Sequence, residues 1–352
     1  NVSITQKFAL SGTGVSSRVV WSPDYYGQLL DVRVGSGASP TAIKVSLPSC
    51  NPNSVAVNNN KLYVACSANG ANPDKILVYN AATIRTAPAG TLTISPLQTI
   101  TNSKFNSLIG IAFDSSNDLW IASYGNNTIF SISAATLNTA SPVVTTELVD
   151  SPPSPTGLAF ATDGSLWVTG QYGGGILLNF PKSQFGLGES AQPAYCIAST
   201  ALSGCQYVNN LFLEPEGVAV FNGDIWVANN SSYNSATGLT SPGRELIDLK
   251  IVSNTLSVNA TYGNASVAAD SPFVCPGGLF ATATHLWVND ESYGETNPGC
   301  GGNGDVATQT GGIFSFTPAQ LAAKTTTVSQ VLNFSNVTGR PGFGGIFVEN
   351  DQ

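Results

Sequence analysis

The sequence predicts an all-β fold assembled from a repeated unit of four antiparallel strands. Three observations lead to this prediction. A short phrase with a central aromatic residue recurs along the chain, a second apolar phrase precedes most of its copies, and no segment has the periodicity of an amphipathic helix. The 352 residues are enough for one large domain. We therefore treat the chain as a repeat protein and derive its elements from the repeat.

The first phrase is an apolar residue, then Trp or Tyr, then an apolar or small residue, then a small or polar one. Its copies are 62–65, 119–122, 166–169, 225–228 and 286–289, with a weaker copy at 20–22. All five tryptophans of the chain stand at the aromatic place of a copy. Short apolar and aromatic runs bounded by turn residues are typical of β-strands, so each copy predicts the second strand of a unit.

The other strands of the unit follow from their places around this phrase. A Gly or Ser followed by an apolar run precedes each strong copy and predicts the first strand, at 54–57, 110–113, 157–160, 217–220 and 278–281. Hairpin turns such as Asp163-Gly164 and Asn222-Gly223 supply the positive φ angles that a tight connection needs. Third strands are predicted at 76–78, 129–132, 176–178, 246–249 and 313–316, and fourth strands at 43–47, 143–148 and 256–260.

Units of this kind are blades of a β-propeller, and the count is six. The copy at Trp21 lacks a preceding first strand, whereas the C-terminus carries an unmatched one at 345–348. We expect these fragments to pair and to close the ring. The predicted organisation is a single six-bladed propeller over 18–352, preceded by an extension over 1–17.

The phrases at 155–168 and 215–228 resemble NHL-type propeller repeats, with the gluconolactonase and senescence-marker-protein propellers as wider relatives. This resemblance implies a divalent cation, Ca²⁺ or Zn²⁺, held in the central channel by side chains at the entrance to the innermost strands. The matching positions are Asn53, Ile109, Thr156, Glu216 and Gly277, of which only Asn53 and Glu216 keep a carboxylate or amide.

Two ligands on opposite sides of the ring would leave a hard cation under-coordinated. Asp24 and Glu349 are further candidates from the incomplete blade. The chain has one histidine, His285, so a site with three histidine ligands cannot be built from it. We interpret His285 as structural and Glu216 as the candidate acid or base of a hydrolase.

Composition excludes several classes of partner. Charged residues make up 10% of the chain, against roughly 25% in average domains, and the net charge is −8. The 13 Lys and Arg residues form no basic run, so nucleic acid is not an expected partner. No apolar stretch reaches the length of a membrane-spanning helix.

Cysteines and sequons indicate an exported protein. The chain begins at Asn1 and contains no Met, which we interpret as the result of signal-peptide removal. Its six cysteines are even in number, and disulfides persist in the extracellular space or the periplasm. Candidate N-glycosylation sites are Asn1, Asn126, Asn229, Asn230, Asn259, Asn264, Asn333 and Asn336.

Propeller geometry predicts which loops share a face. The entry to the first strand and the turn between the second and third strands lie on the same side, so we expect disulfides that join Cys50 to Cys66, Cys196 to Cys205 and Cys275 to Cys300, all on this face. The same face would carry the irregular segments 181–214, 229–244 and 290–312. It would also carry tyrosines that either bind sugars or a partner, or cap the turns of their own blades: Tyr25, Tyr124, Tyr172, Tyr233 and Tyr293.

The extension alternates like a strand over 2–8. It is expected either to form the outermost strand of the last blade or to pair with the edge of a neighbouring subunit, which would propagate a fibre.

The predicted function is a secreted, non-catalytic binding or scaffold propeller without a cofactor. Its expected partner is a glycan, a protein surface or further copies of itself in a glycosylated extracellular fibre. The alternative is a metal-dependent lactone or ester hydrolase of the gluconolactonase type.

Overall fold

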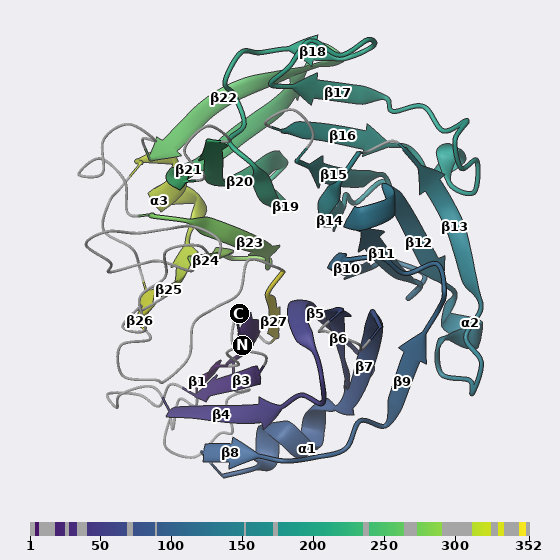
Figure 1. Cartoon of the computed structure of the whole chain (residues 1–352). Helices are drawn as coiled ribbons and strands as arrows, with labels where there is room; N and C mark the ends of the chain where they lie inside the picture. The colour runs from purple at the N-terminus through teal and green to yellow at the C-terminus, as the bar shows by residue number, and fades with distance from the viewer. Residues whose placement is uncertain are drawn as a thin grey trace.

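The computed structural model describes residues 4–6, 18–24, 28–33, 41–68, 73–88, 90–150, 153–171, 175–234, 239–263, 273–290, 312–324, 330–333 and 345–349. These residues form sheets that are arranged radially around a central opening (Figure 1). The fold is an all-β propeller, as the sequence predicts.

Five of the sheets are blades, each built from strands that follow one another along the chain. We name each blade by its innermost strand. The β5 blade contains β5 (Asn51–Asn58), β6 (Lys61–Ser67), β7 (Lys75–Asn80) and β9 (Gln98–Thr101). The β10 blade contains β10 (Leu108–Phe113), β11 (Leu119–Ser123), β12 (Thr128–Ile132) and β13 (Val144–Val149).

The next blades continue around the ring. The β14 blade contains β14 (Pro155–Phe160), β15 (Leu166–Gly170), β16 (Ile176–Phe180) and β17 (Tyr195–Ala198), with β18 (Gln206–Tyr207) parallel to its outer edge. The β19 blade contains β19 (Pro215–Phe221), β20 (Asp224–Asn234), β21 (Leu239–Val252) and β22 (Thr255–Gly263). The β23 blade contains β23 (Pro276–Ala281), β24 (Leu286–Asp290), β25 (Gly312–Phe316) and β26 (Gln330–Asn333).

The remaining sheet, which we call the composite sheet, draws its strands from both ends of the chain. It contains β1 (Ile4–Gln6), β2 (Arg18–Asp24), β3 (Gln28–Arg33), β4 (Thr41–Ser46), β8 (Gly90–Leu92) and β27 (Phe347–Glu349). The predicted pairing of the chain ends is confirmed, because Phe347 lies opposite Trp21 and Val348 lies opposite Val20.

The predicted count of six blades is corrected to five blades and the composite sheet. In the composite sheet β2 pairs with three strands, β1, β3 and β27, and β8 adds a parallel strand outside β4. It therefore departs from the four-strand meander that defines a blade.

The described part of the N-terminal segment pairs within its own chain. Ile4 is opposite Val20 and Gln6 is opposite Arg18, so Ile4–Gln6 lies beside β2 in the composite sheet. The rest of 1–17 lies outside the described residues, so the choice between an outer strand and a strand paired with a neighbouring subunit stays a prediction.

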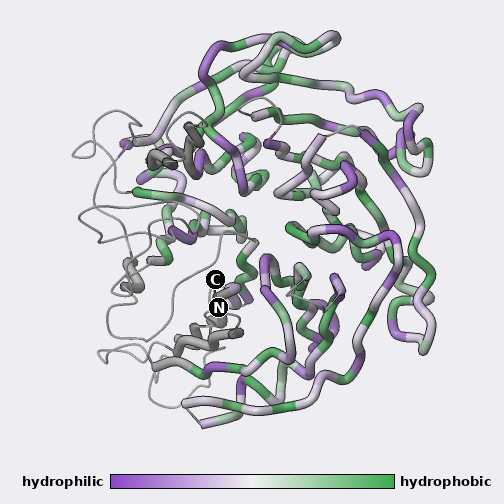
Figure 2. The backbone as a smooth tube through the Cα atoms, in the orientation of Figure 1, coloured by the Kyte–Doolittle hydropathy of each residue, from purple (hydrophilic) through white to green (hydrophobic). Residues whose placement is uncertain are grey.

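The hydrophobic core lies in the wedges between adjacent sheets, and apolar segments follow the strands in Figure 2. The aromatic residue of each second strand packs there: Trp21, Tyr63, Trp120, Trp167, Trp226 and Trp287 are all buried. Burying such large rings in every wedge accounts for their recurrence along the sequence.

Glycine in the first-strand phrase permits the innermost strands to touch through their backbones. A Cβ atom on Gly157 would overlap the carbonyl oxygen of Glu216, and one on Gly217 would overlap the carbonyl oxygen of Gly277. A register shift interrupts the pairing at the same place in these strands. Each innermost strand therefore interlocks with the next at a bulge where a side chain does not fit.

Two predicted disulfides are confirmed. One joins Cys50 to Cys66, and the other joins Cys196 to Cys205. Cys275 is also disulfide-bonded, whereas Cys300 lies outside the described residues, so this pairing stays a prediction.

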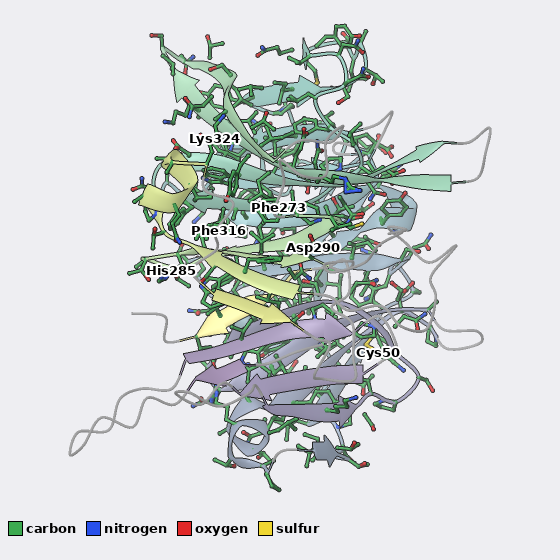
Figure 3. All side chains as sticks on the ribbon, turned by 90° about the vertical axis from the view of Figure 1, so that its left-hand side faces the viewer. Cys50, Phe273, His285, Asp290, Phe316 and Lys324 are labelled. Atoms are coloured by element: carbon green, nitrogen blue, oxygen red, sulfur yellow. A yellow bond between two sulfur atoms is a disulfide. The ribbon has the colours of Figure 1, made fainter. Side chains whose placement is uncertain are left out.

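The segments expected to be irregular need correction. The segment 181–214 contributes β17 and β18 to the outer edge of the β14 blade, because β17 pairs with β16 as the fourth strand and β18 pairs with β17. The Cys196–Cys205 bridge is consequently at the outer edge. The segment 229–244 extends β20 and β21 into a long hairpin, which projects from the disc on the side of Cys50 in Figure 3. Residues 291–311 lie outside the described residues.

Candidate functional site

The candidate site is the central channel, which has a volume of about 320 Å³. Its wall consists of the innermost strands β5, β10, β14, β19 and β23, together with the segment that leads into β27. Backbone groups and small or apolar side chains provide most of this wall. Glu216 is the one ionisable side chain among the described lining residues.

Glu216 occupies the second place of β19, at the end where the chain enters the blade. The side-chain amide of Gln171, which follows β15 in the neighbouring blade, donates a hydrogen bond to its Oε1 atom. The Thr169 hydroxyl donates to the Glu216 backbone carbonyl at 2.8 Å. The carboxylate is therefore held by the adjacent blade and is half-buried at the channel mouth.

Tyr124 lies near this mouth, in the 3₁₀ turn Tyr124–Asn126 that follows β11. Burial raises the pKa of its phenol, a hydrogen bond with Ser154 acts in the opposite direction, and the charges of Glu216 and Glu214 raise it further. The phenol therefore stays protonated at neutral pH and is a hydrogen-bond donor beside two carboxylates.

The residues that enter the innermost strands adopt left-handed backbone conformations. Ser107, Ser154 and Glu214 have φ values of 54°, 49° and 52°, and they immediately precede β10, β14 and β19. Such conformations are uncommon for non-glycine residues and concentrate in functional segments. Here they recur at the same place in consecutive blades, around the channel mouth.

The structure does not bring the predicted cation ligands together. Asn53 donates its side-chain amide to the Leu108 carbonyl at 2.6 Å and to the Ser67 hydroxyl, so it is held against the next blade. It is not among the residues that line the channel, whereas Glu216 is. Thr156 also faces a neighbour, because its hydroxyl donates to the Pro215 carbonyl at 2.9 Å.

The further cation candidates do not complete the set. Glu349 binds Arg85 and the Trp21 indole, and the side chain of Asp24 lies outside the described residues. Within the part of the chain that the structure describes, no three His, Cys, Asp or Glu residues are grouped so as to hold a metal ion. The described residues thus do not fit the calcium or zinc site that the resemblance implies.

His285 is remote from the channel mouth. It lies in the turn that precedes β24, where its Nδ1 atom is 2.9 Å from the Thr284 hydroxyl. Figure 3 places it on one side of the disc, with Cys50 and Asp290 toward the other. Adjacent strands of a blade run in opposite directions. The turn before a second strand, where His285 lies, is therefore on the other side of the disc from the entry to a first strand, where Cys50 lies.

Of the predicted tyrosines, only the side chain of Tyr124 is described. Tyr233 is placed in β20 by its backbone alone, and Tyr25, Tyr172 and Tyr293 lie outside the described residues. The expected aromatic ring on this face stays a prediction.

Two of the predicted glycosylation sites have buried side chains in the folded chain. Asn229 is 0% exposed and donates its amide to the Leu211 carbonyl, and Asn230 is 3% exposed and donates to the carbonyls of Cys275 and Pro276. These buried amides hold the entry segments of the blades, and glycosylation of the two asparagines stays a prediction.

The other sequons fall into two groups. Asn126 is half-buried and donates to Lys104, whereas Asn259 is exposed and donates to Asp248. Asn1, Asn264 and Asn336 lie outside the described residues, as does the side chain of Asn333.

Gln171 is a residue of the channel mouth that the sequence did not indicate. It lies two residues beyond the end of the Leu-Trp-Val-Thr phrase, but nothing in that phrase shows that its amide reaches the adjacent blade. Its one signal in the sequence is that it precedes Tyr172, one of the tyrosines predicted to lie on this face.

Comparisons with known proteins support the fold. No protein-family model matches the sequence, and neither does any curated protein. A Bacteroides caccae protein of unknown function is similar in structure, with a TM-score of 0.56 at 10% identity, over 94% of this chain and 97% of its own. The PQQ-bound aldose sugar dehydrogenase of Streptomyces coelicolor gives 0.52 at 14% identity, over 86% and 90%.

These identities show the propeller fold alone. The predicted membership of the NHL repeats therefore stays a prediction. No helix in the described residues is long and apolar enough to cross a bilayer.

Proposed function

We propose that the protein is an exported, non-catalytic binding propeller that holds part of a protein partner at the mouth of its central channel. The observation that carries this proposal is the composition of the channel: a mainly apolar wall of interlocked strands with one carboxylate, Glu216, at its entrance.

The chemistry of the mouth selects the partner. Glu216 accepts hydrogen bonds, and an arginine or lysine side chain would supply both a donor and a positive charge. The channel beyond it offers apolar contact, for example from Leu158, Val218 and Leu279. A net charge of −8 would attract a basic partner at long range. We therefore propose a segment in which a basic residue adjoins an apolar one.

The hydrolase alternative is less well supported. It needs a cation beside the substrate, and Asn53 is directed toward Leu108 and Ser67 rather than into the channel. The similar structures include enzymes, but at 14% identity or less they carry no information about this site.

Export is the other part of the proposal. The two disulfides point to an oxidising environment, and we propose that it is extracellular or periplasmic. The composite sheet would serve as the sixth and closing element of the ring, because it joins both chain ends. Self-assembly into fibres through 1–17 stays a prediction, and the pairing of Ile4–Gln6 with β2 disfavours it, since this strand is already used within its own chain.

Selection from a displayed peptide library tests the binding proposal. We expect the wild-type protein to enrich peptides with a basic residue next to an apolar one. Glu216→Gln should weaken their binding at least tenfold, and Glu189→Gln, which removes an exposed carboxylate elsewhere, should leave it unchanged.

Two results would contradict the proposal. One is peptide binding that is insensitive to Glu216→Gln. The other is turnover of simple lactones or esters that requires Glu216 and a divalent cation, which would establish the hydrolase instead. A glycan array run in parallel decides whether sugars rather than peptides bind at the mouth.

A further inference from the structure

A second pocket, which we call the far-face pocket, lies in the β19 blade and against the helix α3 (Pro318–Ala322). It has a volume of about 330 Å³, within the range of sites for small ligands. The β19–β20 turn and the end of α3 contribute to it, whereas the channel mouth lies at the opposite end of β19. In Figure 3 Lys324, which follows α3, lies toward the side of His285, away from Cys50.

Asp248 lies in the wall of this pocket and is 4% exposed. It is opposite Trp226 on one neighbouring strand and Ala260 on the other. A register shift after Asp248 makes Asn259 an extra residue in β22, and the amide of Asn259 donates to Asp248 Oδ2. The bulge therefore turns a polar side chain toward the carboxylate.

Two buried polar atoms of the pocket are without hydrogen-bond partners in the described structure. They are Oδ1 of Asp248 and the hydroxyl of Tyr262, whose side chain is 2% exposed. Buried polar groups are almost always partnered, so two such atoms in one pocket call for an explanation. A bound ligand with donor and acceptor groups supplies one.

Asp248 differs from its counterparts in the other blades. The residue opposite the second-strand aromatic is Ser131 in the β10 blade, Asn179 in the β14 blade, Ser315 in the β23 blade and Val78 in the β5 blade, whereas the composite sheet has Asp31 opposite Trp21. A buried carboxylate at this place costs stability, because desolvation opposes its charge.

The charges of the far-face pocket compensate one another. Asp224 pairs with Lys250 at 3.4 Å, and Lys324 lies at the end of α3 near Asp248. Two carboxylates and two ammonium groups favour neither an anion nor a cation. They offer several donors and acceptors, and Trp226 adds an aromatic surface.

We infer that the far-face pocket binds a neutral polyhydroxylated molecule, a sugar ring or a cyclic polyol. Hydroxyl groups both donate and accept, so one such molecule would satisfy Asp248 and Tyr262 while it also bonds with Lys324 and Asn259. Trp226 would contact its apolar face. This site is separate from the channel mouth and does not depend on its function.

Ligand-detected NMR and calorimetry on the full chain test the inference. The probes are D-glucose, D-galactose, D-mannose and myo-inositol at millimolar concentration, with protein from a host that does not glycosylate Asn259. We expect at least one probe to bind. Lys324→Ala, at an exposed side chain, and Asp248→Ser, which introduces the residue that the β10 and β23 blades have at this place, should each weaken binding tenfold or more.

The matched control is Glu147→Gln, which removes a buried carboxylate bonded to Ser131 in another blade and should leave binding unchanged. Absence of binding for all four probes would overturn the inference, as would binding that neither Lys324→Ala nor Asp248→Ser alters. Binding of a zwitterion such as glycine in preference to every probe would also overturn it. Because Glu216 is remote from this pocket, Glu216→Gln should not affect these titrations.

Discussion

Arg85 and Glu349 are 264 residues apart in the sequence and form a bidentate salt bridge. Arg85 Nη2 donates to Oε1 at 2.5 Å and Nε donates to Oε2 at 2.9 Å. The Trp21 indole also donates to Oε2 at 3.3 Å, and the guanidinium carbon lies 5.8 Å from the Trp21 ring centroid. Arg85, in the helix α1 (Ala81–Thr86), thus fastens β27 and β2 together where the chain ends meet.

Replacing Arg85 should loosen this junction. We expect Arg85→Ala to lower the free energy of unfolding by about 2 kcal/mol, because it leaves a partly buried carboxylate without its charged donors. Urea denaturation of Arg85→Ala, Glu349→Gln and the double variant measures the coupling. Lys104→Ala, at an exposed side chain, should change stability by less than about 0.5 kcal/mol. Strict additivity of the two single effects would show that the pair does not contribute.

The interlocked glycines provide a second prediction. Gly217→Ala places a Cβ atom against the Gly277 carbonyl and should cost about 3 kcal/mol, since the overlap is with backbone. Gly204→Ala is the comparison: its φ is +82°, and the space around it is open, so only backbone strain of about 1 kcal/mol is expected. Denaturant unfolding measures the loss of stability in each variant. Equal losses would mean that the close approach of Gly217 to the Gly277 carbonyl does not contribute to stability.

The disulfides should stabilise the chain according to the loops that they close. Their sequence separations are 16 residues for Cys50–Cys66 and 9 residues for Cys196–Cys205. We expect loss of the first bridge, in a Cys50→Ala and Cys66→Ala double variant, to cost about 3 kcal/mol, and loss of the second slightly less. Unfolding in denaturant, with and without reductant, measures both. If reductant left the stability of the wild type unchanged, the disulfides would not contribute as expected.

The repeat itself is what made the fold predictable from sequence. Tryptophan at one place in each unit marks the wedge between blades, and glycine before the first strand marks the interlock, so both the blades and the pairing of Phe347 with Trp21 followed. The blade count did not follow, because the composite sheet recruits β1 and β8 from outside the repeat.

The sites were less predictable than the strands. Asn53 matches a cation-ligand position in the sequence, but its direction is decided by the Leu108 carbonyl of the next blade. The far-face pocket needs α3, β20 and β21 together, and the aspartate at 248 does not signal it in the sequence, because Asp31 stands at the equivalent place opposite Trp21. The sequence pattern of one repeat unit does not show which residues of the neighbouring unit it contacts.

The titration of Asp248 gives a prediction that is independent of any ligand. Burial is the main cause that raises the pKa of its carboxyl, the Asn259 hydrogen bond opposes this, Asp224 adds to it, and Lys250 and Lys324 oppose it. The folded chain then holds a proton that the unfolded chain has released as the pH rises above the ordinary aspartate range. Wild-type stability should therefore fall relative to Asp248→Asn as the pH rises above the ordinary aspartate pKa of about 4.

Asp163 supplies the control of opposite sign. Hydrogen bonds from the Ser165 hydroxyl and backbone lower the pKa of its carboxyl, so the wild type should gain stability relative to Asp163→Asn as the pH rises through the acidic range. Thermal unfolding of the wild type and both variants across this range measures the two slopes. Parallel curves for the wild type and Asp248→Asn would show that Asp248 titrates alike in the folded and unfolded chains, and that its carboxylate is better solvated than its burial implies.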